Sequence, residues 1–97
     1  MYYKLNEDKS ISEVLDVVYW GKNMEKRWQV KKEVDNILVS TVFLGIDHNW
    51  NEGPPILFET MIFGGEHDQY QERCATYEEA LEMHKVACEL VWPTPQL

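Results

Sequence analysis

Apolar positions near the N-terminus recur at the spacing of an amphipathic helix. The first stripe has the i, i+3, i+4, i+7 pattern and consists of Ile11, Val14, Leu15 and Val18. A second, adjacent stripe consists of Val17, Trp20 and Met24. Ser10-Ile-Ser-Glu13 matches a capping box, in which the serine and glutamate side chains satisfy amides of the first turn. The pattern predicts a helix that begins after Ser10 and ends between residues 21 and 26.

The central half of the chain has the character of β-strands. Apolar and polar residues alternate from Trp28 to Val34, and Ile37–Ile46 is rich in β-branched and aromatic residues. Asp35-Asn36 between them suits a two-residue hairpin turn, because both residues tolerate positive φ. Two further strands are predicted at 56–63 and 69–74, and a short edge strand at 1–5. The residues between these runs, 47–55 and 64–68, are loops by composition.

A second helix is predicted at the C-terminal end. Thr76-Tyr-Glu-Glu79 is a capping box, and Pro93 ends the helix, which we expect over about residues 77–91. Its apolar stripe consists of Tyr77, Ala80, Leu81, His84, Cys88 and Val91.

These elements predict one α+β domain over residues 1–97. It is an antiparallel meander of about four strands with an N-terminal and a C-terminal helix, in two layers. Both helices bury their stripes most simply on one face of the sheet. The other face then stays partly bare, and an apolar bare face is expected to serve dimerisation or partner binding.

Composition places the chain among globular proteins. Of 97 residues, 44% are hydrophobic and 12% aromatic, which excludes a disordered chain. No window of about 18 apolar residues predicts a membrane span, and the N-terminus lacks the apolar run of a signal peptide. We therefore expect a cytoplasmic protein with no membrane association.

The net charge of −8 is unevenly distributed. Residues 1–32 carry seven basic and five acidic side chains, whereas residues 33–97 carry two basic and twelve acidic ones. Nucleic-acid binding through the acidic two-thirds is not expected, because phosphates would be repelled. The basic cluster from Lys22 to Lys32 is either a phosphate contact or a solvated face.

The sequence offers little catalytic chemistry. Cys74 and Cys88 have no metal-site spacing, and a helix would hold them too far apart for a disulfide, so two reduced, mostly buried thiols are predicted. His48, His67 and His84 fall on separate elements, and His84 lies on the helix stripe as a core-margin histidine. We expect no catalytic residues, no metal site and no cofactor.

The central run resembles a family of small, uncharacterised phage- and prophage-encoded proteins. The matching pieces are VSTVFLGIDH at Val39–His48 and GPPILFETMIFGG at Gly53–Gly65, followed by Gln71–Arg73 and Thr76–Glu79. The resemblance implies a mobile-element origin and a bacterial cytoplasm, and it implies no reaction. This chain departs from the family in the loop, where residues 49–52 replace the usual glycines.

These observations predict a non-enzymatic phage accessory protein that binds a host protein, with inhibition of a defence or regulatory protein as one such role. The candidate partner-binding residues lie in the loop at 47–55, where this chain differs from the family, and are Asp47, His48, Trp50 and Glu52. Trp50 either folds back over the sheet end or is an exposed anchor. A homodimer is also expected, with Trp20, Trp28 or the bare sheet face in the contact. The alternative is a protein that binds a small molecule or nucleotide signal at a homodimer interface; convergent Arg or Lys in a pocket would favour it.

Overall fold

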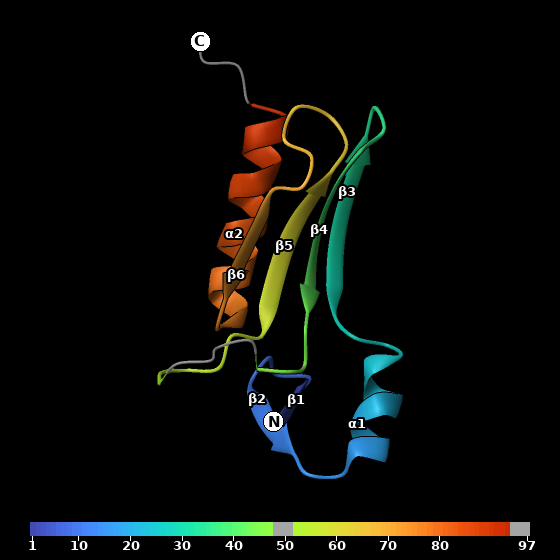
Figure 1. Ribbon diagram of the computed structural model, residues 1–97, viewed down its shortest axis with the longest axis vertical. Helices are drawn as coiled ribbons and strands as arrows, with labels where there is room; N and C mark the ends of the chain where they lie inside the picture. The colour runs from blue at the N-terminus through green and yellow to red at the C-terminus, as the bar shows by residue number, and fades with distance from the viewer. Residues whose placement is uncertain (48–51, 94–97) are drawn as a thin grey trace.

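The computed structural model describes residues 1–47 and 52–93 and has an α+β fold (Figure 1). The elements in chain order are β1 (Tyr2–Leu5), β2 (Ile11–Val14), α1 (Val17–Met24), β3 (Gln29–Val34), β4 (Ile37–Phe43), β5 (Phe58–Phe63), β6 (Gln71–Cys74) and α2 (Tyr77–Val91). No helix in this described part of the chain is long and apolar enough to cross a bilayer.

The predicted meander is confirmed. β3, β4, β5 and β6 form one antiparallel sheet in chain order. Asp35 and Asn36 make the β3–β4 turn at φ values of 54° and 66°, as their tolerance of positive φ predicts. Thr41 on β4 pairs with Val30 on one side and Thr60 on the other, which fixes the register of the three strands.

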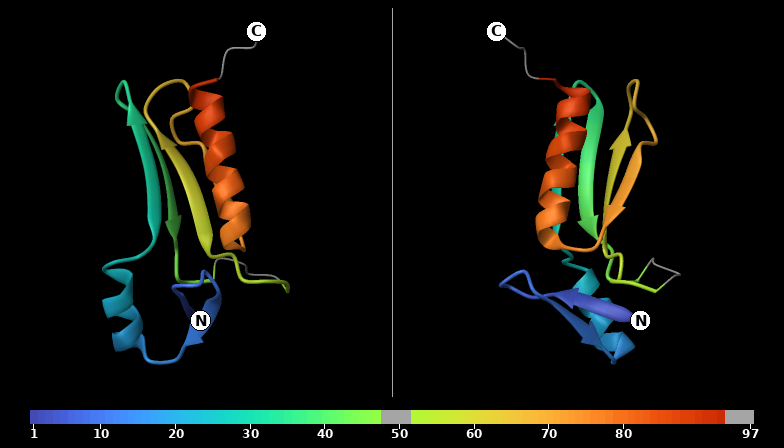
Figure 2. Two further views of the ribbon diagram at one scale, coloured as in Figure 1. Left: turned by 180° about the vertical axis from the view of Figure 1, so that it is seen from behind. Right: turned by 90° about the vertical axis from the view of Figure 1, so that its left-hand side faces the viewer.

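One face of the sheet packs against α2. Figure 2 shows α2 running along that face, in contact with β4, β5 and β6. The fully or nearly fully buried side chains of this layer are Val39, Thr41, Phe43, Phe58, Thr60, Ile62, Ala80 and Ala87. The two small alanines let the helix approach the sheet closely. The predicted helix stripe is wrong at Leu81, which is 45% exposed.

The start of α2 is confirmed at the predicted capping box. The Thr76 hydroxyl accepts from the Glu79 amide, and the Glu79 carboxylate accepts from the Thr76 amide. The two residues therefore satisfy each other's orphan donors and set the helix start.

The predicted helix start at Ser10 is wrong. Residues 11–14 form β2, which pairs antiparallel with β1, and the Ser10 hydroxyl donates to Asp8 instead of capping a helix. The helix begins six residues later, where the Asp16 carboxylate accepts from the amides of Val18 and Tyr19. Residues 11–14 have helical periodicity but form a strand, because they pair with a strand that comes earlier in the chain.

The hairpin β1–β2 and helix α1 lie at one end of the sheet rather than on its face (Figures 1 and 2). α1 packs against β1 and β2, and β1 reaches the sheet through the bridge between Tyr2 and Ile46. The prediction that both helices cover one sheet face therefore holds for α2 alone. No helix or strand within residues 1–47 and 52–93 packs on the face opposite α2, which we call the open face.

Candidate functional site

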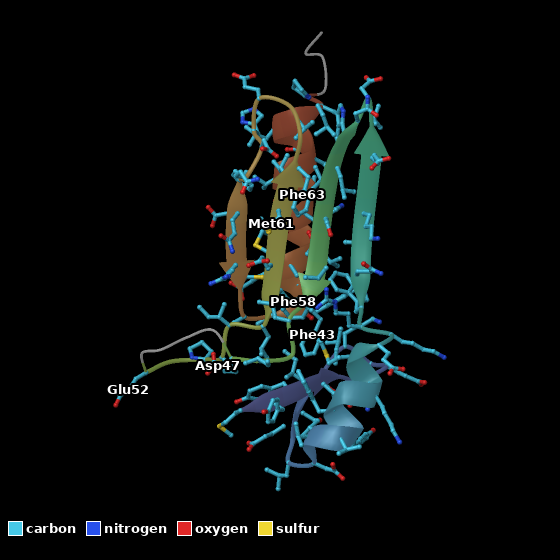
Figure 3. All side chains as sticks on the ribbon, turned by 45° about the vertical axis from the view of Figure 1, so that its right-hand side comes forward. Phe43, Asp47, Glu52, Phe58, Met61 and Phe63 are labelled. Carbon is cyan, nitrogen blue, oxygen red and sulfur yellow. The ribbon has the colours of Figure 1, made fainter. Side chains whose placement is uncertain are left out.

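The open face of the sheet is the candidate functional site. Figure 3 views this face, with α2 behind the sheet and the labelled Met61 and Phe63 on β5. Side chains alternate along a strand, so the neighbours of the α2-facing residues point outward. The outward residues of the two central strands are Leu38, Ser40, Val42, Glu59, Met61 and Phe63. Phe63 is 41% exposed and pairs directly with Leu38.

Polar side chains border this apolar stripe on both sides. On the β6 side, Glu59 pairs with Arg73, with 2.8 Å between its Oε2 and the arginine Nε, and it also accepts from the Gln71 side chain. The carboxylate is oriented by these contacts, and Glu59 is only 13% exposed. On the β3 side, Lys31 and Glu33 are exposed. An apolar centre with a polar, hydrogen-bonded rim is the usual composition of a protein-binding surface.

Of the sequence-predicted partner-binding residues, the two that the structure describes, Asp47 and Glu52, lie apart from this face (Figure 3). Asp47 is half-buried, and its carboxylate accepts from the Ile56 amide at 2.9 Å, so it ties the two ends of the loop together. Glu52 is exposed, and Figure 3 shows it at the far end of the loop. His48 and Trp50 lie outside the described residues. Partner binding by these four loop residues stays a prediction.

Trp20 and Trp28, the predicted dimer contacts, pack within the chain. The Trp20 indole N–H donates to the Gly45 carbonyl at 3.1 Å, and its ring centroid lies 4.7 Å from that of Tyr2. Trp28 meets Phe58 and Tyr77 edge-on at centroid distances of 5.9 and 5.3 Å. Both side chains are half-buried by these contacts, so a dimer would meet only their remaining surface.

His84 occupies the layer between α2 and the sheet, as the core-margin prediction requires. Its Nδ1 lies 2.8 Å from the Thr41 hydroxyl, which in turn shares a hydrogen bond with Thr60. Its Nε2 lies 3.6 Å from the Cys88 thiol. Burial lowers the pKa of His84 below its ordinary value, and the nearby Lys32 ammonium lowers it further. The histidine is therefore held in its neutral form.

Burial disfavours the thiolate form of both cysteines. Burial raises the pKa of the Cys88 thiol, so little of it is thiolate near neutral pH. Burial likewise raises the pKa of Cys74 to about 11. Both cysteines are free and half-buried rather than mostly buried, and their reduced state stays a prediction.

The two histidines that the structure describes, His67 and His84, lie on different elements. His67 lies in the β5–β6 turn, at the opposite end of β5 from the loop that Asp47 begins (Figure 1). Within residues 1–47 and 52–93, no group of three His, Cys, Asp or Glu side chains has metal-binding geometry.

A second surface feature was not predicted from the sequence. Lys4, Lys9, Lys26 and Arg27 line one groove between the β1–β2 hairpin and the segment that joins α1 to β3. Only Lys26 and Arg27 belong to the basic cluster at residues 22–32, and nothing local marks the two N-terminal lysines as their neighbours. The open face, in contrast, carries a visible signal in the alternation of residues 37–43 and 58–63.

No family model, curated protein or solved structure matches this chain.

Proposed function

We propose that this protein is a non-enzymatic binding protein that docks a second, different protein on the open face of its sheet. The observation that carries the proposal is the apolar stripe of Leu38, Val42, Met61 and Phe63 on that face. α2 covers the opposite face, and the hairpin and α1 sit at the sheet end. A flat apolar stripe on central strands gains stability when a partner removes it from water.

The chemistry of the rim favours a protein partner over a nucleic acid. Glu59 is paired with Arg73, so the β6 side of the face is close to neutral. Residues 33–97 as a whole carry twelve acidic and two basic side chains, and this charge repels phosphates. The neutral, hydrogen-bonded border suits the polar rim that surrounds the apolar core of protein interfaces.

The resemblance of residues 37–84 to phage- and prophage-encoded proteins supports a host protein as the partner, in the bacterial cytoplasm. Inhibition of a host defence or regulatory system is the role that fits an accessory protein of this kind. The raised pKa of both cysteine thiols, about 11 for Cys74, leaves little thiolate near neutral pH, which supports a binding role over cysteine-based catalysis.

The test compares two exposed apolar positions on opposite sides of the molecule. Phe63 on the open face is 41% exposed and Leu81 on α2 is 45% exposed, so a lysine at either position costs the fold little. We expect wild-type protein and the Leu81→Lys variant to retain the same host protein from lysate, and Phe63→Lys to lose it. Calorimetry with the purified partner should then give an affinity at least about tenfold weaker for Phe63→Lys.

Circular dichroism melts of both variants establish that they are folded. The proposal is wrong if Phe63→Lys binds the purified partner as tightly as wild type does. It is also wrong if the face cross-links only to a second copy of this chain.

A further inference from the structure

A groove at the end of the sheet gathers four positive side chains in a chain whose net charge is −8. Its volume is about 270 Å³. The groove lies within one chain, between the β1–β2 hairpin, the end of α1 and the start of β3. It is separate from the open sheet face, and its role does not depend on docking there.

Two of the four cations are held by aromatic rings rather than by carboxylates. The Lys4 ammonium lies 5.4 Å from the Tyr19 ring centroid and 3.4 Å from its hydroxyl. The Lys9 ammonium lies 5.6 Å from the Tyr77 ring centroid. Contacts of this kind position a cation over a ring face without cancelling its charge.

The hairpin turn fixes the backbone of Lys9. Lys9 has a φ of 71°, and its amide donates to the Asn6 carbonyl at 2.9 Å. The Asp8 carboxylate, which accepts from the amide and hydroxyl of Ser10, braces the other side of the turn. Lys9 thus lies in an ordered turn that borders the groove.

The other two cations, Lys26 and Arg27, follow α1 and are exposed. Across the described ranges 1–47 and 52–93, the one ion pair within 4.0 Å is Arg73–Glu59, so no carboxylate neutralises any of the four. Glu7 also lines the groove and leaves its wall at a net charge of +3. Four cations thus border one groove without a carboxylate partner within 4.0 Å among the described residues, and the positive potential of this wall favours an anion over a cation or a neutral ligand.

We propose that this groove binds a small polyphosphorylated anion, of which a nucleoside triphosphate is the representative. The Arg27 guanidinium can offer two parallel donors to one phosphate, and the lysines serve as point charges for others. Met24 and Trp28 supply an apolar wall for the organic part of such a ligand. The volume is close to that of the smallest ligand pockets, about 300 Å³, so the groove suits the polyphosphate and only part of a nucleoside.

The test is a backbone amide NMR titration at low salt with inorganic triphosphate, with ATP and with adenosine. We expect saturable shifts at Lys9, Lys26 and Arg27 with both phosphate compounds and none with adenosine alone. Arg27→Gln should weaken ATP binding about tenfold, the usual effect of losing one charge-assisted contact.

Lys85→Gln is the matched control, because Lys85 is an exposed cation on α2 and does not line the groove. It should change the affinity less than about twofold. Phe63→Lys on the open face should also leave ATP binding unchanged, so a failure of this proposal is distinguishable from a failure of the docking proposal.

Three outcomes would overturn the inference. The first is the absence of saturable shifts with either phosphate compound. The second is an equal loss of affinity in Arg27→Gln and Lys85→Gln, which would mean non-specific charge attraction. The third is tighter binding of single-stranded oligonucleotide than of ATP, with the same amides shifting, which would make the groove a nucleic-acid contact.

Discussion

The Nδ1 atom of His84 lies 2.8 Å from the hydroxyl of Thr41, so α2 is joined to the centre of the sheet by a polar contact inside an otherwise apolar layer. Thr41 and Thr60 are both fully buried cross-strand partners, and their hydroxyls hydrogen-bond to each other. The chain of contacts therefore spans β5, β4 and α2. A buried polar chain of this kind is favourable only while every member keeps its partner.

The first prediction concerns the pH dependence of stability. The pKa of His84 is lowered from its ordinary value of 6.5, chiefly by burial, so the unfolded chain binds more protons than the folded one as the pH falls below that value. The stabilising contribution of neutral His84 is present above pH 6.5 and is lost as the pH falls toward its folded pKa. Urea unfolding at several pH values between about 7.5 and 5 should show this loss.

His84→Gln is the matched variant, because its amide retains hydrogen-bonding capacity but does not titrate. Its free energy of unfolding should fall less than that of the wild type over the same pH range. Parallel profiles for the two proteins would contradict the assignment of this titration to His84.

The second prediction concerns the two threonines. Thr41→Val removes the shared hydroxyl and leaves Thr60 and His84 each short of a partner, which should lower the free energy of unfolding by about 1–3 kcal/mol. Because the partners act together, adding Thr60→Val should cost less than it costs alone. Ser40→Ala, one residue away on the open face, should change stability by less than about 0.5 kcal/mol. Urea melts of the four variants give all these values, and strictly additive losses would contradict a connected chain.

The strands of the main sheet could be predicted from the sequence because their signals are local. The Asp35-Asn36 turn fixes one hairpin, and alternation decides which side of β4 and β5 faces the core. The N-terminal helix start could not be predicted, because Ile11–Val14 has an ambiguous pattern that only its partner strand, Tyr2–Leu5, resolves. Non-local pairing decides such a segment.

The open face and the groove also differ in whether the sequence could predict them. A bare sheet face follows from counting the elements available to cover the sheet, and it could be predicted without a structure. The groove could not, because Lys4 and Lys9 meet Lys26 and Arg27 only after the hairpin is placed at the sheet end. His84 could be predicted on the buried stripe, whereas its partner Thr41 required the β4 register and the helix packing.

The third prediction uses a pair of glycines. Gly64 has a φ of 91°, and a Cβ there would lie 2.7 Å from the Asn36 carbonyl oxygen, so Gly64→Ala should destabilise the protein by about 1–3 kcal/mol. Gly21 lies in α1 with nothing within 4 Å of the same position. Gly21→Ala should therefore stabilise by about 0.5–1 kcal/mol, through the entropy of the unfolded chain. Thermal melts give the sign of the stability change for each variant. A loss of stability in Gly21→Ala would mean that α1 is not helical at that residue.

The fourth prediction is that stability does not depend on a metal ion. His67 and His84 lie on the β5–β6 turn and on α2, and neither belongs to a ligand cluster within the described ranges. Thermal melts with and without a chelator should coincide. A drop of several degrees with chelator, restored by one added divalent metal, would mean that a ligand set exists and that the predicted separation of the histidines is wrong.

The last prediction is self-association through the corner between β2 and α1. Three apolar side chains lie there, Leu15, Val17 and Val18, with exposed fractions of 88%, 51% and 64%. Within residues 1–47, no other apolar residues so close together in the sequence are as exposed. The same short patch on two copies can meet across a twofold axis. The excess of basic residues in 1–32 and of acidic residues in 33–97 favours contacts between the N-terminal part of one copy and the rest of the other.

Light scattering across a micromolar range should give a mass that rises toward twice 11.5 kDa. Val18→Lys should shift the protein to monomer, whereas Val86→Lys, at a 46% exposed position on α2, should leave the association unchanged. A wild-type mass that stays near 11.5 kDa at every concentration would exclude the dimer.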